Sequence, residues 1–201
     1  MSSLHRIAVV CGLTVLMAAA AQAEDWKVAK DEGGINISLS EVAGSKYKAY
    51  RGVTTIKASV AKLRGLQEDV VGACTWIHEC KSQKLLKYDG AKTWTYTQFN
   101  TPWPVTPRDS VLLVTSEQGA DGTLTRTLKG EPTYIPEEKG FVRVAQVEGF
   151  WKFVPKGADQ TEVTYEVHTE PGGSVPSWLA NKFVVDAPFN TLKALKEKAE
   201  K

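Results

Sequence analysis

The sequence predicts an α+β domain in which a curved antiparallel sheet of about eight or nine strands packs around one long C-terminal helix. Many short segments alternate apolar and polar residues with a period of two, which is typical of half-buried strands. The clearest of them runs from Thr161 to Thr169, where Val163, Tyr165 and Val167 share one face. The chain then ends in a segment with apolar residues at helical spacing. This order of elements predicts a sheet with one dry face, covered by the terminal helix.

The other elements follow from the same periodicities. Strands are expected at residues 26–28, 35–39, 47–56, 93–97, 110–117, 124–128, 141–147 and 150–154. A helix is expected over residues 59–71, because Ser59 can cap it and apolar residues from Val60 to Val70 recur at three- and four-residue spacing. The C-terminal helix is expected to begin near Pro176, after a Gly172-Gly173 turn in which Ser174 can cap. Its apolar stripe contains Trp178, Leu179, Phe183, Val185, Phe189 and Leu192.

The N-terminus resembles a secretory signal peptide. An apolar run from Ile7 to Ala21 follows a short basic start, and Ala21-Gln22-Ala23 has the small-x-small pattern of a cleavage site. The run is shorter than the ~20 residues that a membrane-spanning helix needs. We therefore expect residues 1–23 to be removed and residues 24–201 to form a single domain in the periplasm or outside the cell. A retained membrane anchor is the alternative.

Charge excludes one class of partner, and the cysteines suggest a covalent link. The chain has 25 Lys and Arg against 23 Asp and Glu, so nothing favours nucleic acid. Cys74 and Cys80 remain after processing, and in an oxidising compartment a disulfide between them is expected, worth about 2 to 3 kcal/mol. Free thiols are the alternative. With only His78 between them, the two cysteines do not match zinc spacing, and no metal or other cofactor is predicted.

The aromatic residues on the predicted inner faces suggest a cavity rather than a solid core. Their polar tips need partners when they are buried, whereas a filled core would use Leu, Ile and Val. The inward aromatics are expected to be Trp94, Tyr96, Trp151, Tyr165 and Trp178. A solid core remains the alternative at this point.

Several blocks of the sequence resemble the START (StAR-related lipid transfer) family of the helix-grip fold. They are the opening strand at 26–37, the segment around Trp76, the Pro107-Arg108-Asp109-Ser110-Val111 strand entry, and the turn from Thr169 to Leu179. They occur in the family's order and cover essentially the whole mature chain. The resemblance implies a curved sheet that grips the C-terminal helix, with an apolar ligand between them. Members bind sterols, phospholipids, ceramides or other apolar molecules, so the resemblance does not identify the ligand.

From these faces and the resemblance we expect a protein that binds a lipid or other hydrophobic molecule in an internal cavity, with transfer of that molecule as its further role. It is expected to be a monomer that contacts membranes transiently, with Trp103 at the entrance and Pro188 as a hinge in the closing helix. The expected ligand-contacting residues are Trp94, Tyr96, Trp103, Arg108, Arg143, Trp151, Tyr165, Trp178, Phe183 and Phe189.

Catalysis is the second hypothesis, as a cyclase- or hydratase-like enzyme of the same fold superfamily. No nucleophile elbow or phosphate-binding glycine loop is present. The visible acid or base candidates are Arg108, Asp109, Glu148 and Tyr165, and they form no recognisable pair. Arg108 and Asp109 are adjacent in a strand and must point to opposite faces. One of them either faces the ligand or ties the Trp103 loop to the sheet. No catalytic residue is assigned.

Overall fold

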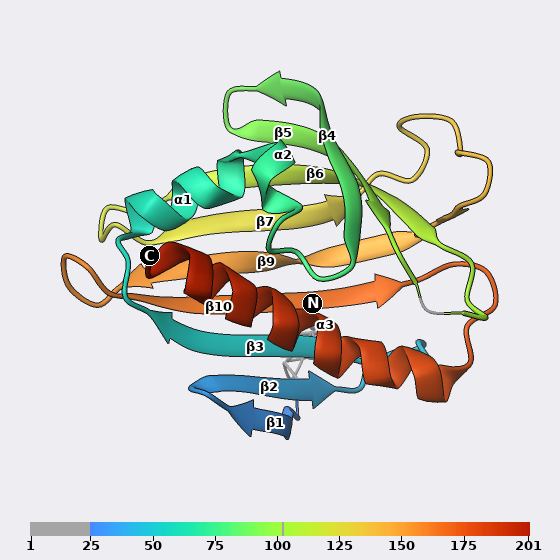
Figure 1. The fold of residues 1–201 in the computed structure, drawn as a ribbon, viewed down its shortest axis with the longest axis horizontal. Helices are drawn as coiled ribbons and strands as arrows, with labels where there is room; N and C mark the ends of the chain where they lie inside the picture. The colour runs from blue at the N-terminus through green and yellow to red at the C-terminus, as the bar shows by residue number, and fades with distance from the viewer. Residues whose placement is uncertain (1–24, 102) are drawn as a thin grey trace, which may run out of the picture.

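One sheet dominates the structure and curves around the C-terminal helix (Figure 1). The structure is a computed structural model that describes residues 25–101 and 103–201. In chain order the elements are β1 Lys27–Glu32, β2 Ile35–Ser40, β3 Ala49–Ile56, α1 Val60–Glu68, α2 Val70–Ala73, β4 Cys80–Asp89, β5 Lys92–Phe99, β6 Arg108–Gln118, β7 Leu124–Gly130, β8 Val142–Arg143, β9 Gln146–Pro155, β10 Thr161–Glu170 and α3 Ser177–Ala199.

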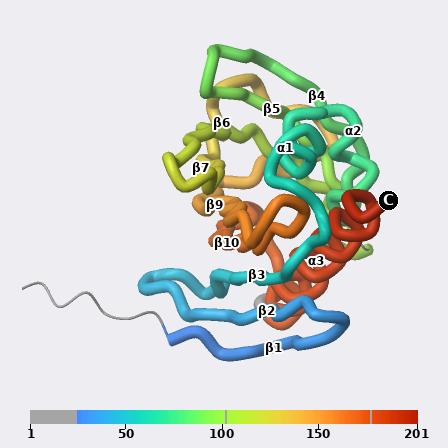
Figure 2. The backbone as a smooth tube through the Cα atoms, turned by 90° about the vertical axis from the view of Figure 1, so that its left-hand side faces the viewer, coloured from blue at the N-terminus to red at the C-terminus, as the bar shows by residue number. Residues whose placement is uncertain are grey.

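The strand order is β1-β2-β3-β10-β9-β7-β6-β5-β4, with every pair along this path antiparallel, and the short β8 pairs in parallel with β6. Figure 2 shows that the sheet curves, with β1–β3 at one end and β4–β5 at the other, and that α1, α2 and α3 lie on one side of it. The predicted curved antiparallel sheet with a closing C-terminal helix is therefore confirmed. The helices cover the concave face and leave an interior space.

The segments before β4 differ in detail from the periodicity. Ser59 caps α1 as expected, since its side chain accepts a hydrogen bond from Lys62 N. The predicted helix over 59–71 breaks at Asp69, whose carboxylate accepts from Gly72 N and caps the short α2. A disulfide joins Cys74 to Cys80 across 5.2 Å between Cα atoms, and so ties the end of α2 to β4. The alternation analysis did not predict β4, because its two faces are both largely exposed.

Two further strand predictions needed correction. The expected strands at 141–147 and 150–154 are instead the two-residue β8 and a continuous β9 that runs through Gly149. Gly149 lies inside β9 and does not end the strand. The neighbouring β10 is so close at this point that a Cβ on residue 149 would be 2.1 Å from Glu166 O. Glycine at this position therefore permits a close strand approach rather than a turn.

The closing helix packs on β2 and β3 through its second half. Leu192 and Leu195 are fully buried there, and Gly52 makes room, because a Cβ at that position would meet Leu192 at 2.5 Å. The helix begins at Ser177 with Pro176 as its N-cap and no side-chain cap, so Ser174 does not cap it as expected. Pro188 lies inside a continuous helix. The hinge that we predicted there stays a prediction.

The predicted signal peptide, residues 1–23, lies outside the described residues. In the part of the chain that the structure describes, no helix combines the length and apolar character needed to cross a bilayer.

Candidate functional site

The concave side of the sheet holds two neighbouring chambers that share part of their lining. The first has a volume of about 300 Å³ and lies between α3 and strands β3, β6, β9 and β10. The second, of about 350 Å³, lies between α1, α2 and strands β4 to β7. Both volumes fall at the lower end of the range of small-molecule sites. The residues that line both chambers are Ile77, Phe99, Leu112, Leu128, Tyr165 and Thr191.

The first chamber is mainly apolar, with phenol groups at selected points. Its walls include Val144, Val147, Val167, Phe183, Val184 and Ala187. Tyr165 stacks on Trp151 with ring centroids 3.7 Å apart, and Tyr50 meets Tyr165 edge-on at 5.2 Å. Burial raises the pKa of Tyr50 well above its ordinary value and raises that of Tyr165 as well. Both phenols are therefore neutral near pH 7 and keep their hydrogen-bond donors.

Arg108 places a cation in the wall of the first chamber. It is 6% exposed and donates through Nη1 to Thr106 O and through Nη2 to Gly172 O at 3.2 Å. Burial lowers the pKa of its guanidinium. Its Nε has no hydrogen-bond partner among the described residues. Arg108 therefore does both things that the sequence left open: it ties two loops to the sheet, and it faces the cavity.

The second chamber contains residues that sequence reasoning missed. Arg126 of β7, Gln67 of α1 and Trp76 all line it. Arg126 is 4% exposed and lies between Leu124 and Leu128 on the inward face of its strand. An arginine between two buried leucines at a period of two was the available signal, because a charge on a dry face is costly without a role.

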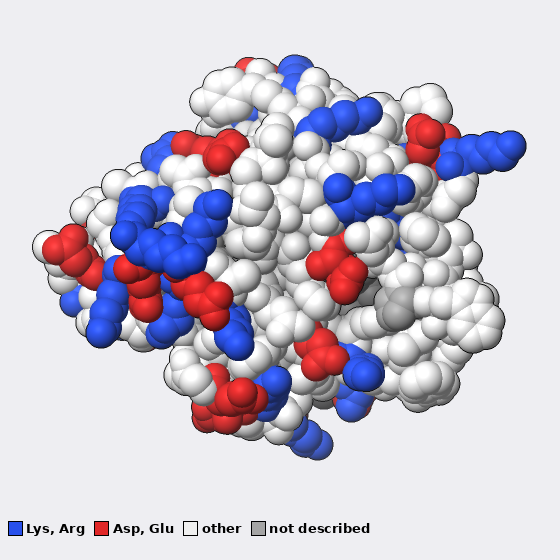
Figure 3. All heavy atoms as spheres, in the orientation of Figure 1, with Lys and Arg blue, Asp and Glu red and all other residues white. Residues whose placement is uncertain are grey.

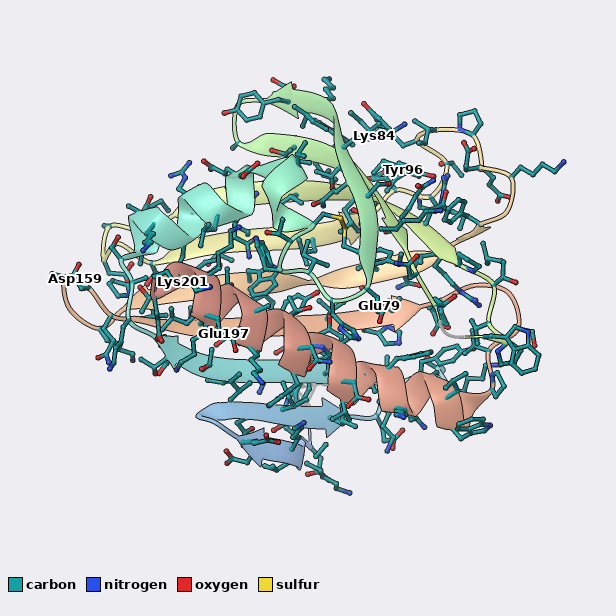
Figure 4. All side chains as sticks on the ribbon, viewed as in Figure 1. Glu79, Lys84, Tyr96, Asp159, Glu197 and Lys201 are labelled. Carbon is teal, nitrogen blue, oxygen red and sulfur yellow. A yellow bond between two sulfur atoms is a disulfide. The ribbon has the colours of Figure 1, made fainter. Side chains whose placement is uncertain are left out.

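Trp94 and Tyr96 do not face the cavity, and that expectation was wrong. The intervening threonines of β5, at 93, 95 and 97, line the second chamber instead. Trp94 stacks on Tyr134 of the loop between β7 and β8, with centroids 5.9 Å apart. Tyr96 lies on the outer side beside Lys84, whose Nζ is 4.9 Å from its ring (Figure 4). The loop after β7 covers this outer face, so aromatic residues are buried there without pointing inward.

Arg143 also belongs to the outer face, so its expected ligand contact is wrong. Its Nε and Nη2 donate to Asp109 at 2.9 and 3.0 Å, and Tyr96 Oη donates to the same carboxylate at 2.9 Å. Because Asp109 follows Arg108 in β6, it points away from the chambers. The Asp109–Arg143 pair is thus a structural link and no part of the cavity wall.

Three other expected contacts lie away from the chambers. Trp103 is 92% exposed and Trp178 is 70% exposed. The first turn of α3 extends beyond the sheet (Figure 1), which explains why no strand covers Trp178. Phe189 is buried but faces the β1–β2 side, where Lys30 Nζ lies 3.6 Å from its ring centroid. Of the predicted set, Arg108, Trp151, Tyr165 and Phe183 line the cavity.

A Ser-His-Glu group near the end of β10 is the nearest approach to catalytic chemistry. Ser45 Oγ lies 2.5 Å from Glu170 Oε1 and 3.2 Å from His168 Nε2. The same Nε2 is 3.5 Å from the Glu170 carboxylate. A nucleophilic triad instead needs the second ring nitrogen on the carboxylate, so that Nε2 is left to the serine. The cluster is therefore a hydrogen-bonded link between the β2–β3 loop and β10.

The remaining acid and base candidates do not converge on the cavity. Asp109 is held on the outer face, and Glu148 is exposed with Gln146 as its hydrogen-bond partner. Within residues 25–101 and 103–201, no group of three or more His, Cys, Asp and Glu could hold a metal ion.

Comparison with known proteins decides the family. The START domain family model matches residues 11–200, which is nearly the entire chain. The chain belongs to the START domain family. A protein of Pseudomonas aeruginosa described as uncharacterized is 60% identical over 201 residues, covering all of both chains.

Solved structures of START proteins share the fold. A STAR-related lipid transfer protein from Xanthomonas axonopodis is 38% identical, with a TM-score of 0.82 over 88% of this chain and 99% of that one. Human StAR-related lipid transfer protein 5 is 18% identical, with a TM-score of 0.76 over 87% and 86% of the two chains. An aromatase/cyclase from Streptomyces, 12% identical and covering 76% and 93%, has a TM-score of 0.52 and shares the fold alone. A START domain with an apolar cavity supports hydrophobic ligand binding.

Proposed function

We propose that the protein binds one apolar molecule in its two-chamber cavity and carries it through the periplasm between membranes. The observation that carries this proposal is the cavity itself, which has apolar walls, neutral phenols and few charges. The lipid-transfer proteins that share the fold support it, as does the signal-like N-terminus for the location. No catalytic group is required.

Burial of the ligand supplies the binding energy. Each methylene group removed from water contributes about 0.8 kcal/mol, so a 16-carbon chain offers about 13 kcal/mol before the cost of immobilising it. The phenol of Tyr165, at the junction of the chambers, can orient a polar atom of the ligand without a charge.

The entrance is proposed to lie where the β5–β6 loop meets the start of α3. Val105 of the loop, Val175 and Ala180 all line the first chamber and pack together with Tyr47. Trp103, two residues before Val105 in the same loop, is exposed. Figure 3 shows that the end of the molecule where α3 begins carries mostly uncharged side chains on this face, while charges gather at the other end. A tryptophan side chain has an apolar ring and a polar N–H, so an exposed tryptophan on an uncharged surface is suited to the membrane–water interface.

Native mass spectrometry of the mature protein is the primary test. We expect a single co-purified apolar molecule, released when the protein unfolds. A protein that is always empty, and that takes up no fluorescent fatty acid or phospholipid from vesicles, would refute the proposal. The periplasmic location is tested separately: the N-terminal sequence of exported protein should begin at Glu24.

The membrane contact is tested by transfer of an NBD-labelled fatty acid between phosphatidylethanolamine–phosphatidylglycerol vesicles. Trp103→Ala and Trp178→Ala should each slow transfer about tenfold while equilibrium binding changes less than twofold. Val28→Ala is the control, because Val28 is 64% exposed on the edge strand β1, away from the entrance. Transfer at the wild-type rate by both tryptophan variants would show that this rim is not the membrane contact.

A further inference from the structure

The second chamber contains an unusual set of buried donors without partners. The side-chain atoms Gln67 Nε2, Trp76 Nε1 and Arg126 Nε have no hydrogen-bond partner among the described residues. All three residues line this chamber. Buried polar groups in folded proteins are nearly always hydrogen-bonded, so three orphan donors in one cavity indicate a missing acceptor. The fourth orphan there, Gln83 Oε1, belongs to an amide that can turn its NH₂ group toward the same space.

Arg126 is the charged member of this set. Its one side-chain hydrogen bond runs from Nη1 to Gln67 Oε1 at 3.3 Å, and none of the ion pairs among the described residues includes it. The neighbouring Glu68 is instead paired with Arg64 at 2.8 Å. Burial lowers the pKa of Arg126 to about 10, so the guanidinium stays charged at neutral pH. A buried charge without a counter-charge is destabilising unless something else compensates it.

The arrangement of these hydrogen-bond donors indicates which kind of acceptor group fits between them. The free Nε and the adjacent Nη of a guanidinium form a planar fork that matches the two oxygens of a carboxylate. Gln67, already in contact with Arg126, adds a neutral donor beside the fork. Apart from Glu68, which is paired with Arg64, the rest of the chamber wall is apolar or neutral and includes Val114 and Trp151. The chamber also shares Leu112 and Leu128 with the apolar first chamber, and a hydrocarbon chain that passes these side chains would reach it.

We propose that the second chamber is a carboxylate subsite, in which Arg126 and Gln67 hold the acid group of a long-chain carboxylic acid. The hydrocarbon tail extends past Leu112 and Leu128 into the first chamber, toward Phe183 and the entrance. This assignment rests on the proposed function, and it names the ligand class and its direction: the acid group enters first. Arg108 contributes less, because two of its three nitrogens already bond to backbone carbonyls.

The test compares three probes of equal chain length on delipidated protein at pH 7.5: hexadecanoic acid, its methyl ester and hexadecyl phosphate. Wild type should bind the acid at least tenfold more tightly than the ester. In Arg126→Met this preference should disappear, with the acid weakened about tenfold to a hundredfold and the ester unchanged or bound more tightly. Gln67→Leu should show a smaller loss in the same direction. Lys62→Met, which removes an exposed cation from α1 at a position that does not line the chamber, is the matched control and should bind like wild type.

Thermal unfolding distinguishes a ligand-binding arginine from a structural one. The ligand-free Arg126→Met variant should unfold at the same or a higher temperature than wild type, whereas a purely structural arginine would lower it. Equal affinity of wild type for acid and ester would overturn the carboxylate subsite and leave apolar binding intact. Tighter binding of hexadecyl phosphate than of the acid would overturn the choice of carboxylate. Failure of the ester and the acid alike to bind would overturn the proposed function itself.

Discussion

Asp109 and Arg143 form an ion pair whose removal should reveal its structural role. Their side chains are 1% and 4% exposed, and two nearly parallel hydrogen bonds of 2.9 and 3.0 Å join them. Arg143 also donates to backbone carbonyls of the loop between β7 and β8, at Pro132, Ile135 and Pro136. The pair therefore fastens that loop over the outer face of β5 and β6.

Asp109→Ala leaves a buried guanidinium without its counter-charge. Breaking such a pair from one side costs about 3–5 kcal/mol. For a domain of this size each kcal/mol lowers Tm by about 2–4 °C, so a fall of roughly 6–20 °C is expected. Arg143→Met should lower the free energy of unfolding by a similar amount, because it leaves the Asp109 carboxylate and three backbone carbonyls without their hydrogen-bond donor. The double variant should cost clearly less than the two single losses combined, since it leaves neither charge buried alone.

Urea unfolding followed by tryptophan fluorescence and far-UV circular dichroism measures these free energies. The exposed pair between Arg64 and Glu68 is the control, and its removal should cost under about 1 kcal/mol. Additive losses, or an Asp109→Ala cost below about 1 kcal/mol, would refute the reasoning. Arg143→Met should also bind hexadecanoic acid within about twofold of wild type where it is folded. A large loss of affinity would place Arg143 in the site after all.

Four further outcomes are expected. Leu112→Trp, which fills the junction between the chambers, should lower affinity for 16-carbon probes at least tenfold while leaving shorter ones less affected, as titration with a chain-length series would show. Gly149→Ala should destabilise by about 1–3 kcal/mol or more because its Cβ has no space, whereas Gly65→Ala, in an open helix position, should stabilise by up to about 1 kcal/mol in the same urea assay. Cys74→Ser should cost no more than about 2 to 3 kcal/mol, because the disulfide closes a short loop, and a loss of folding would contradict that value. Since burial raises the pKa of Tyr165, the folded state holds the phenolic proton more tightly; this stabilisation is fully present below about pH 10 and declines as pH rises further, so Tyr165→Phe should show a shallower loss of stability than wild type in alkaline titration.

The architecture could be predicted from the sequence because its periodicities are local. The alternation in β10 and the apolar stripe of α3 follow from burial of one face, and a one-residue change of register would reverse the faces of a strand. Which face is inward is a different matter. In β5 the aromatic residues lie outside because a distant loop covers them, and no property of 93–97 alone contains that information.

The site was predictable where the inward face was also the apolar face. Trp151 and Tyr165 line the cavity because their strands, β9 and β10, turn their bulky residues toward the helix. The prediction that Trp178 faces the cavity was wrong because helical spacing contains no information about where the sheet ends along α3. The apolar alternation of β7 does not single out Arg126, although a charge within that stripe is the more informative feature.

The position of β10 in the sheet has a consequence for how the chain reaches its folded state. This strand is the last in the sequence, yet it lies between β3 and β9, and its pairing with β3 joins Thr161 to Ile56. Contacts of such long sequence separation are associated with slow folding, in the range of milliseconds to seconds. Until β10 has emerged and paired, the edges of β3 and β9 stay open to any other chain. The unpaired edges of β3 and β9 are therefore covered only when the C-terminal part of the chain has been made. A shortened chain that ends before β10 is expected to aggregate rather than to form a smaller domain.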